Sequence, residues 1–327
     1  MIRAKIVGTG SYLPEKILSN HDLEKIVDTT DEWIRTRTGI SERRIAEKGT
    51  NTSDLALIAS QRALEAAGLT PKDIDLIVMS TITPDSACPS ASCWLQAKLG
   101  APQAAAFDVV AACSGFIFGL SVAEQYIRTG QFHNILFASA EIMSRTVNWT
   151  SRESCVLWGD GAGAVILQPT EEERGVLSVH LHSDGTHGDK LLLPGGGSMA
   201  SPITHETVAA DRHTLKMEGP DSFKVAVRAF TDVCREALEY NCMSVDDIDL
   251  FIPHQANIRI IDAVAKRLEM PAEKAVVTIH KYGNISAATI PIALDEAVRE
   301  GRVKKGNHLL MAAFGGGLTW GAALARW

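Results

Sequence analysis

The sequence predicts an α/β fold built from two related halves. The segment Leu69–Val78 is repeated as Met243–Ile252, which places Ile74 and Ile248 174 positions apart. Each copy has an amphipathic, alanine-containing stretch followed by a short apolar run, the pattern of a helix that leads into a buried strand. Short apolar runs alternate with helical stretches through both halves, which favours βαβ units and a mostly parallel sheet.

A second pair of segments supports the repeat. Phe107–Val110 precedes Cys113 and a helix, and Val276–Ile279 precedes Asn284 and another helix. Cys113 and Asn284 lie 171 positions apart, close to the first offset. We therefore expect a strand at each segment and place Asn284 at the repeat position of Cys113. Chance similarity between alanine-rich segments is the alternative, and two pairs at nearly one offset argue against it.

Charged residues mark the boundary between the halves. The run Glu171–Arg174 is hydrophilic, so we expect one half over residues 1–172 and a second over 173–327. The first half would contain Cys113, and the second would contain His254 and Asn284; the chemistry of these three residues is taken up below. Pro194–Leu215 contains three consecutive glycines and few apolar residues, which predicts a long surface loop.

Composition excludes several classes of function. A net charge of −7 argues against general nucleic-acid binding, which needs a basic surface. No segment approaches the roughly 18 consecutive apolar residues of a membrane helix. The first residues resemble a strand and not a signal peptide, so we expect a soluble, cytoplasmic protein. The six cysteines form no CxxC pair, and each by default is a small buried apolar residue.

Two weaker patterns do not indicate a cofactor or metal. Gly159–Ala164 matches a dinucleotide fingerprint, but strand-like residues follow it where a helix is required, so we interpret it as a tight turn between strands. His180, His182 and His187 could suggest a metal site, but this spacing is common without one. We expect no metal.

Cys113 lies between a predicted strand and a predicted helix. Phe116, Ile117, Leu120, Ala123 and Ile127 follow it at helical spacing and form an apolar stripe. The sulfur would lie at a helix N-terminus, where free amides and the helix dipole stabilise a thiolate. A structural cysteine is the commoner alternative for an isolated residue, and the strand–turn–helix context favours a nucleophile.

Two polar residues of the second half would meet this cysteine. His254 follows the strand predicted at residues 249–253, and the carboxyl ends of strands are where α/β sheets bind ligands. If the halves are related by approximate two-fold symmetry, Asn284 faces Cys113 and His254 lies beside Asn284. Hydrogen bonding to a loop is the alternative role for the histidine.

The chain resembles the thiolase superfamily of condensing enzymes, and most closely β-ketoacyl-acyl carrier protein synthase III. The resemblance covers the whole chain and rests on six motifs: WIRTRTGISERR (33–44), AACSGF (111–116), GDGAGA (159–164), PHQANIRII (253–261), YGNISAA (282–288) and AFGGGLTWG (313–321). The set Cys113, His254 and Asn284 is the Cys–His–Asn set of this branch. Related elongating synthases have Cys–His–His, and thiolases have Cys–His–Cys.

The resemblance implies a five-layer αβαβα fold and a homodimer. It also implies condensation of acetyl-CoA with malonyl-acyl carrier protein at the start of type II fatty-acid synthesis, without a cofactor. Cys113 would accept the acyl group, with its amide and that of Gly316 as oxyanion donors. His254 and Asn284 would donate hydrogen bonds to the malonyl thioester carbonyl as carbon dioxide leaves.

The resemblance also assigns binding residues. For CoA these are Trp33, Arg37, Thr38, Arg152, Phe223 and Asn257, with the adenine between Trp33 and Arg152. For an acidic carrier protein they are Gln255, Ala256, Asn257, Ile258, Arg259, Lys224, Lys266 and Arg267. A solvated helix face without a partner is the alternative for this second set.

Starter choice is assigned to Cys88. The family resemblance implies that this position lies on a loop that closes the acyl pocket of the other subunit. A small residue at this position leaves space in the pocket for acyl groups longer than acetyl. Three alternatives remain at this point: a condensing enzyme for longer or specialised acyl-CoA starters, a thioester hydrolase on the same fold, and an inactive carrier-binding module.

Overall fold

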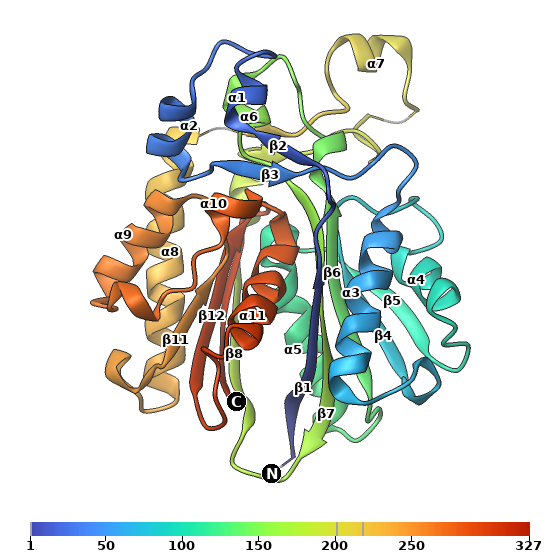
Figure 1. Cartoon of the computed structure of the whole chain (residues 1–327), viewed down its shortest axis with the longest axis vertical. Helices are drawn as coiled ribbons and strands as arrows, with labels where there is room; N and C mark the ends of the chain where they lie inside the picture. The colour runs from blue at the N-terminus through green and yellow to red at the C-terminus, as the bar shows by residue number, and fades with distance from the viewer. Residues whose placement is uncertain (1, 201, 218) are drawn as a thin grey trace.

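A computed structural model describes residues 2–200, 202–217 and 219–327, and these form five layers in the order αβαβα (Figure 1). The first outer layer contains α3 (Thr52–Ala67) and α4 (Ala91–Leu99). The central layer contains α5 (Gly115–Arg128) and α11 (Thr289–Arg299). The other outer layer contains α8 (Gly219–Tyr240) and α9 (Ile258–Leu268).

The first sheet has the strand order β1-β7-β6-β4-β5. Its strands are β1 (Arg3–Tyr12), β4 (Leu76–Ser80), β5 (Ala105–Val109), β6 (Ile135–Ile142) and β7 (Asp160–Thr170). Strand β4 pairs in parallel with β5 and β6, whereas β7 pairs antiparallel with β6 and β1. Strand β5 is therefore an edge strand.

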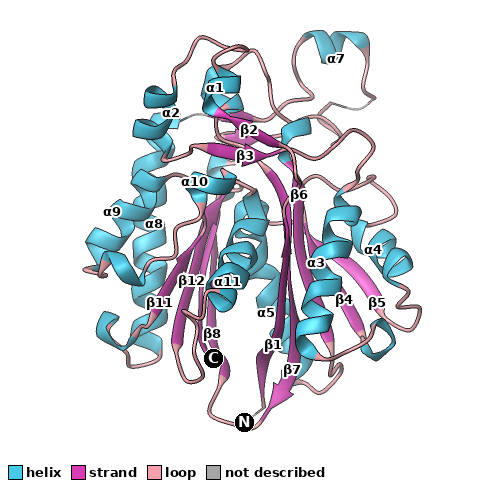
Figure 2. Ribbon diagram, in the orientation of Figure 1, coloured by secondary structure: helices cyan, strands magenta, loops and turns pink. Residues whose placement is uncertain are grey.

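The second sheet has the order β11-β12-β13-β8 (Figure 2). Its strands are β8 (Gly175–Ser183), β11 (Leu250–Pro253), β12 (His308–Gly315) and β13 (Thr319–Arg326). Only β11 and β12 pair in parallel, because β13 follows β12 through a tight connection that reverses the chain. The expectation of a mostly parallel sheet was wrong, since both sheets are mixed.

The internal repeat is present in the structure. Strands β4 and β11 begin 174 positions apart, and so do helices α5 and α11. The strand expected at Val276–Ile279 is absent, because the only pairing there is an isolated bridge between Phe251 and Ala275. The chain instead enters the short helix α10 (Ile279–Tyr282). Within the described residues, the second half therefore has no counterpart of β5 at this position.

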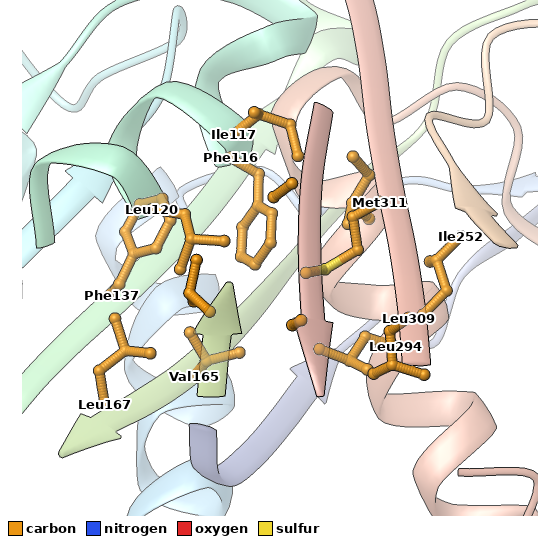
Figure 3. Packing of buried hydrophobic residues seen from close by; sticks show 14 of the residues in the cluster. Phe116, Ile117, Leu120, Phe137, Val165, Leu167, Ile252, Leu294, Leu309 and Met311 are labelled. Atoms are coloured by element: carbon orange, nitrogen blue, oxygen red, sulfur yellow. The ribbon is translucent and has the colours of Figure 1, made fainter. Parts of the chain in front are cut away.

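The main core lies between the two sheets (Figure 3). The apolar stripe predicted for α5 is fully buried there, and the ring of Phe116 stacks on Phe137 with centroids 5.1 Å apart. Leu294 of α11 and Met311 of β12 belong to the same cluster. Two further clusters bury the outer helices against the opposite sheet faces. This packing fixes α5 and α11, whose first turns carry the site described below.

Smaller elements cover one end of the layers, where the parallel strands β4, β5 and β6 of one sheet and β11 and β12 of the other have their carboxyl ends (Figure 1). They are β2 (Ile17–Ser19), α1 (Asn20–Leu23), α2 (Asp31–Thr38), β3 (Glu42–Arg44), α6 (Arg152–Cys155), β9 (Leu191–Leu192), α7 (His205–Ala209) and β10 (Lys216–Met217). The predicted loop at Pro194–Leu215 is largely exposed and includes α7. Within the described ranges, no helix has the length and apolar character needed to cross a bilayer.

Candidate active site

Cys113 lies in a short 3₁₀ turn, Ala112–Ser114, between β5 and α5. Ala112 has φ +46°, a left-handed conformation that is strained for a non-glycine residue and turns the chain sharply. The turn is held from the opposite sheet, because Ser114 Oγ donates to Thr319 O (2.8 Å) and Thr319 Oγ1 donates to Ala111 O (3.1 Å). The cysteine is thus placed at the start of α5 by contacts from both halves.

The surroundings of Cys113 keep it protonated. Burial raises the pKa of its thiol to about 12, and the hydroxyl of Ser286 opposes this only in part. This effect of burial opposes the stabilisation of a thiolate that the sequence suggested for the helix N-terminus. Only 4% of Cys113 is exposed, so loss of water around the sulfur disfavours the charged form. The thiol must therefore lose its proton as it attacks.

A cavity of about 1030 Å³ opens beside Cys113. Gly316, Ile142 and Trp158 line it near the cysteine, and the loop around Cys88 lines its rim. Part of the long loop, including Gly195–Gly197 and Ile203, also borders it. The cavity is large enough for an acyl chain next to the sulfur.

His254 follows β11 directly, as the sequence predicted. Its backbone amide donates to Ala312 O (2.8 Å), and its Nδ1 lies 2.6 Å from Thr289 Oγ1. The residue is 1% exposed, and Nε2 has no hydrogen-bond partner among the described residues. Burial lowers the pKa of His254 to about 3, so the ring is neutral at physiological pH. A neutral imidazole has one N–H to donate.

Asn284 does not lie at the repeat position of Cys113. The first turns of α5 and α11 correspond at an offset of 174, which pairs Cys113 with Ala287. The prediction was wrong by three residues because α10 interrupts the segment before the turn. Asn284 Oδ1 accepts from Ser286 N (2.8 Å), so its Nδ2 amide is the group left to donate.

Packing brings the three residues together. The turn that contains Cys113 packs against the 3₁₀ turn Ser286–Ala288, which follows Asn284 by two residues. It also packs against β12, whose Ala312 holds the backbone of His254. The site therefore combines residues from both halves at the carboxyl ends of the strands.

Sequence reasoning missed two residues next to the nucleophile. A Cβ on Gly315 would lie 2.8 Å from Cys113 Cβ, so glycine is required there for close approach. Glu141 is fully buried and accepts hydrogen bonds from Thr83 Oγ1 (2.6 Å) and Ile82 N (3.1 Å). Burial raises its pKa to about 7. The sequence feature that could have pointed to Glu141 is that it is the single acidic residue in the apolar segment Ile135–Ile142.

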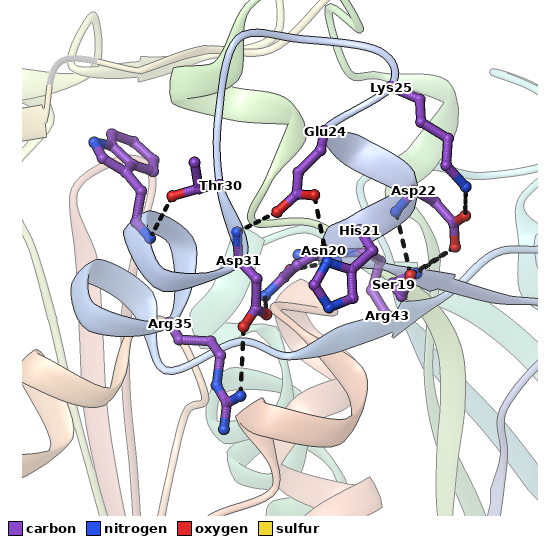
Figure 4. A network of polar contacts seen from close by, with 11 residues as sticks. Ser19, Asn20, His21, Asp22, Glu24, Lys25, Thr30, Asp31, Arg35 and Arg43 are labelled. Atoms are coloured by element: carbon purple, nitrogen blue, oxygen red, sulfur yellow. Dashed lines mark hydrogen bonds and ion pairs between the residues drawn. The ribbon is translucent and has the colours of Figure 1, made fainter.

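Two arginines contact the ring of Trp33 in α2. Arg37 Cζ is 4.6 Å and Arg152 Cζ is 4.9 Å from the centre of its ring, which makes two cation–π contacts. A polar network fixes the start of α2 (Figure 4). In it Asn20 Nδ2 donates to Asp31 Oδ1 (2.9 Å), and Thr30 caps the helix at Trp33 N (3.1 Å).

The other predicted CoA residues have structural partners. Thr38 is buried, and its hydroxyl donates to Ile34 O (2.7 Å). Asn257 caps α9 and donates to Arg37 O (2.9 Å), which links α9 to α2. Phe223 packs under Arg259, whose Cζ lies 5.8 Å from the ring centre. Direct contact of these residues with CoA stays a prediction.

The predicted carrier-protein surface is largely exposed. Arg259, Lys266 and Arg267 are exposed on α9, Lys224 is exposed on α8, and Ala256 and Ile258 are half-buried. The inner face of α9 is buried, as predicted, at Ile261, Val264, Ala265 and Leu268.

Gln255 was wrongly included in that surface. It is 0% exposed, and its side chain donates to Pro253 O (2.7 Å) and Val276 O (3.0 Å). These bonds connect the end of β11 to Val276, in the segment that precedes α10. Gln255 therefore supports the backbone next to His254 and cannot contact a carrier protein.

Other sequence interpretations need correction. Gly161 and Gly163 lie within β7 and not in a turn, and a Cβ on Gly163 would lie 2.8 Å from backbone atoms of α11. Cys88 and Cys242 are exposed, so burial is not common to all six cysteines. His180 and His182 both contact the Glu236 carboxylate, at 3.1 and 2.6 Å. In the part of the chain that the structure describes, no group of three or more His, Cys, Asp or Glu side chains is arranged so that it could hold a metal ion.

Comparison with known proteins relates the sequence to one family. Residues 107–185 match 3-oxoacyl-[acyl-carrier-protein (ACP)] synthase III, and residues 238–327 match the C-terminal region of that family. A protein named β-ketoacyl-[acyl-carrier-protein] synthase III from Caldanaerobacter subterraneus subsp. tengcongensis is 53% identical over 326 residues, covering 100% of this chain and 98% of that protein. One of the same name from Xanthomonas campestris pv. campestris is 53% identical, covering 100% and 99%.

Solved structures give the same relationship. The crystal structure of 3-oxoacyl-[acyl-carrier-protein] synthase III from Aquifex aeolicus matches with a TM-score of 0.93 and 47% identity, covering 99% of this chain and 100% of that one. The Pseudomonas aeruginosa synthase III structure matches with a TM-score of 0.92 and 38% identity, covering 99% and 98%. OleA from Xanthomonas campestris shares the fold at 19% identity, with a TM-score of 0.87.

Proposed function

The chain belongs to the 3-oxoacyl-[acyl-carrier-protein] synthase III family, and on this premise we propose that Cys113, His254 and Asn284 carry out its reaction. It is an acyltransferase that forms a carbon–carbon bond in fatty-acid synthesis, condensing a short acyl-CoA with malonyl-acyl carrier protein. The observation that carries the assignment is a buried thiol at the wall of a cavity of about 1030 Å³, in a turn that packs against the turn following Asn284 and against the strand that holds the backbone of His254.

In the first half-reaction Cys113 attacks the acyl-CoA carbonyl. The thiol gives up its proton, the carbon–sulfur bond to CoA breaks, and CoA leaves as its thiol after taking a proton. The acyl group remains on Cys113 as a thioester. The amides of Cys113 and Gly316 are proposed to bind the oxyanion that forms, and Gly315 permits the two segments to approach closely.

In the second half-reaction malonyl-acyl carrier protein loses carbon dioxide. The electron pair of the broken bond forms an enolate, whose carbon attacks the acyl carbonyl on Cys113 and releases the cysteine sulfur. His254 and Asn284 are proposed to donate to the enolate oxygen. Both are neutral donors, because burial lowers the pKa of His254 and an amide does not titrate.

Product analysis separates this function from its alternatives. The protein is incubated with acetyl-CoA and malonyl-acyl carrier protein, with EDTA present and no added cofactor, because we propose that neither metal nor cofactor takes part. We expect ketoacyl-carrier protein and carbon dioxide. Free acetate without ketoacyl product would indicate a hydrolase, and unchanged substrates would indicate a binding module; either result overturns the proposal.

We propose that CoA binds at Trp33, with its adenine between the indole ring and Arg152, which requires Arg152 to move off the ring because its Cζ now lies 4.9 Å from the ring centre. The two arginines already lie within 5 Å of the ring centre, so their charges are close to where the phosphates would pass. Contributions from Thr38, Phe223 and Asn257 would be indirect, through the positions of α2 and α9.

An acidic carrier protein is proposed to dock on the exposed face of α9. Arg259→Glu should raise the Michaelis constant for malonyl-carrier protein while leaving kcat nearly unchanged, because it reverses a charge at the docking surface. The salt dependence of the wild-type constant should weaken in the variant. Lys305→Glu, at an exposed position on another loop, is the matched control. Equal constants for both variants and wild type would contradict this surface.

Starter choice is proposed to depend on Cys88, at the pocket of the other subunit as the family resemblance implies; in its own chain Cys88 lines the cavity that contains Cys113. Each buried CH₂ contributes about 0.8 kcal/mol, so a deeper pocket favours longer chains by several-fold per carbon. We expect butyryl- and isobutyryl-CoA to be used alongside acetyl-CoA, and Cys88→Phe to reduce kcat/KM for the longer starters selectively. Cys242→Phe adds the same ring at an exposed site outside the cavity. An unaltered preference in Cys88→Phe would exclude Cys88 as the determinant.

We propose that two chains associate through β5. This edge strand is followed by Val110, which is 74% exposed, and Trp94 on the adjacent α4 is 42% exposed. Cys88 is close to the same surface, so a partner could also cover the cavity rim, as the family implies. Light scattering should give a dimer mass for the purified protein. A monomer mass at micromolar concentration would contradict this.

The halves 1–172 and 173–327 are proposed as the two units of the repeat. Support comes from the segment between β7, which ends at Thr170, and β8, which begins at Gly175. A cytoplasmic location is also proposed, because both substrates are cytoplasmic molecules in the type II pathway. Cell fractionation that finds the protein elsewhere would contradict it.

A further inference from the structure

Thr289 contacts His254 on the side away from its free nitrogen. Its Oγ1 lies 2.6 Å from His254 Nδ1, and the two residues are 3% and 1% exposed. Thr289 is the first residue of α11 and therefore has a fixed position in the central layer. Thr289 lies just outside the motif at residues 282–288, and the family motifs named above assign no role to its hydroxyl.

The hydroxyl has three neighbours but only one proton. Gln255 N can only donate to it, at 3.3 Å, and Ser286 O can only accept from it, at 3.1 Å. Nδ1 could do either, depending on the tautomer of the ring. The position of this single proton therefore decides which nitrogen of His254 carries hydrogen.

Two observations place the proton toward the histidine. Ser286 O already accepts from the backbone amide of Thr289, so it does not need the hydroxyl. The 3.1 Å separation from Ser286 O is long for an O–H···O bond, whereas 2.6 Å to Nδ1 suits a hydroxyl donor better than an N–H donor. Nδ1 then accepts, and the ring hydrogen of a neutral imidazole is on Nε2.

We propose that Thr289 is a positioning residue that fixes His254 as the tautomer protonated at Nε2. This rests on the proposed role of His254 as a donor to the enolate. Nε2 is buried and has no hydrogen-bond partner among the described residues, so its N–H is available to a substrate oxygen. Because burial keeps the ring neutral, Nε2 could not donate if the hydrogen were on Nδ1.

The test compares Thr289→Val, which keeps the shape but lacks the hydroxyl, with Thr289→Ser, which retains it. We expect Thr289→Val to slow malonyl decarboxylation by roughly 10- to 100-fold, as is typical when the partner that orients a histidine is lost. Thr289→Ser should restore the rate. Acylation of Cys113 should proceed in both, which also shows that both variants fold. Equal decarboxylation in Thr289→Val and wild type would overturn the proposal.

A direct measurement separates this inference from the proposed function. ¹⁵N NMR of labelled protein should show hydrogen on Nε2 of His254 in the wild type and in Thr289→Ser, and a shift toward Nδ1 protonation in Thr289→Val. Hydrogen on Nδ1 in the wild type would overturn the inference. Loss of decarboxylation in His254→Ala with no effect of Thr289→Val would overturn the role of Thr289 alone. Normal decarboxylation in His254→Ala would instead overturn the proposed function.

Discussion

Replacing Cys113 with alanine will abolish acyl transfer from acyl-CoA. Removal of a nucleophile costs on the order of 10⁶ in rate when catalysis depends on a covalent intermediate. Intact-protein mass spectrometry after incubation with acetyl-CoA should show one added acetyl group on the wild type and none on the variant. The fold should persist, because the substitution removes a single sulfur atom from a site that borders a cavity.

Two other buried cysteines provide the control. Cys155 and Cys234 are 0% exposed, and burial raises the pKa of each thiol, as it does for Cys113. Alanine at either position should leave acetylation intact, because neither residue lines the cavity. Acetyl groups that persist on Cys113→Ala, or that disappear with Cys155→Ala, would contradict the assignment of the nucleophile.

Replacing His254 or Asn284 with alanine will impair decarboxylation more than acylation. Loss of one oxyanion donor typically costs about 10²–10³ in rate, and each residue is assigned to the enolate. Carbon dioxide release from malonyl-carrier protein measures the second half-reaction, and acetylation of Cys113 measures the first. The double variant should lose less than the product of the two single effects, because both donors bind the same oxygen.

His308→Ala is the matched control, since His308 begins β12 at the end away from the site. It should retain both half-reactions. If His254→Ala and Asn284→Ala acylated poorly but decarboxylated at the wild-type rate, their assignment to the enolate would be wrong.

Much of the fold follows from local sequence. The two copies of the apolar run became β4 and β11, and the stripe that begins at Phe116 became the buried face of α5. Both depend on periodicity, which burial imposes directly on the sequence. The inner face of α9 was predictable for the same reason.

Features that depend on chain reversal or on distant partners were not predictable. The mixed sheets arise because tight connections such as that between β12 and β13 reverse the chain, and apolar runs do not reveal strand direction. Asn284 was misplaced by three residues because a helical turn replaced a strand. The glycines of β7 appeared to form a turn, although Gly163 is there for the approach of α11.

The candidate site was predictable only in part. The position of His254 after a strand followed from the sequence, whereas the protonated state of Cys113 depends on burial by segments more than 150 residues away. The contact between His254 and Thr289 also could not be inferred, because 35 residues separate them. The burial of Cys113 exists only after the two halves have packed together, and the contact between His254 and Thr289 exists only after β11 and α11 have packed within the second half.

The central claim is that an acyl group on Cys113 is the direct precursor of the new carbon–carbon bond. The most direct measurement is a chase: protein labelled with radioactive acetyl-CoA is freed of CoA and mixed rapidly with unlabelled malonyl-acyl carrier protein. We expect the label to leave Cys113 and to appear in acetoacetyl-acyl carrier protein at least as fast as steady-state turnover. Label that is released as acetate, or that stays on the protein while ketoacyl product accumulates, would contradict the claim.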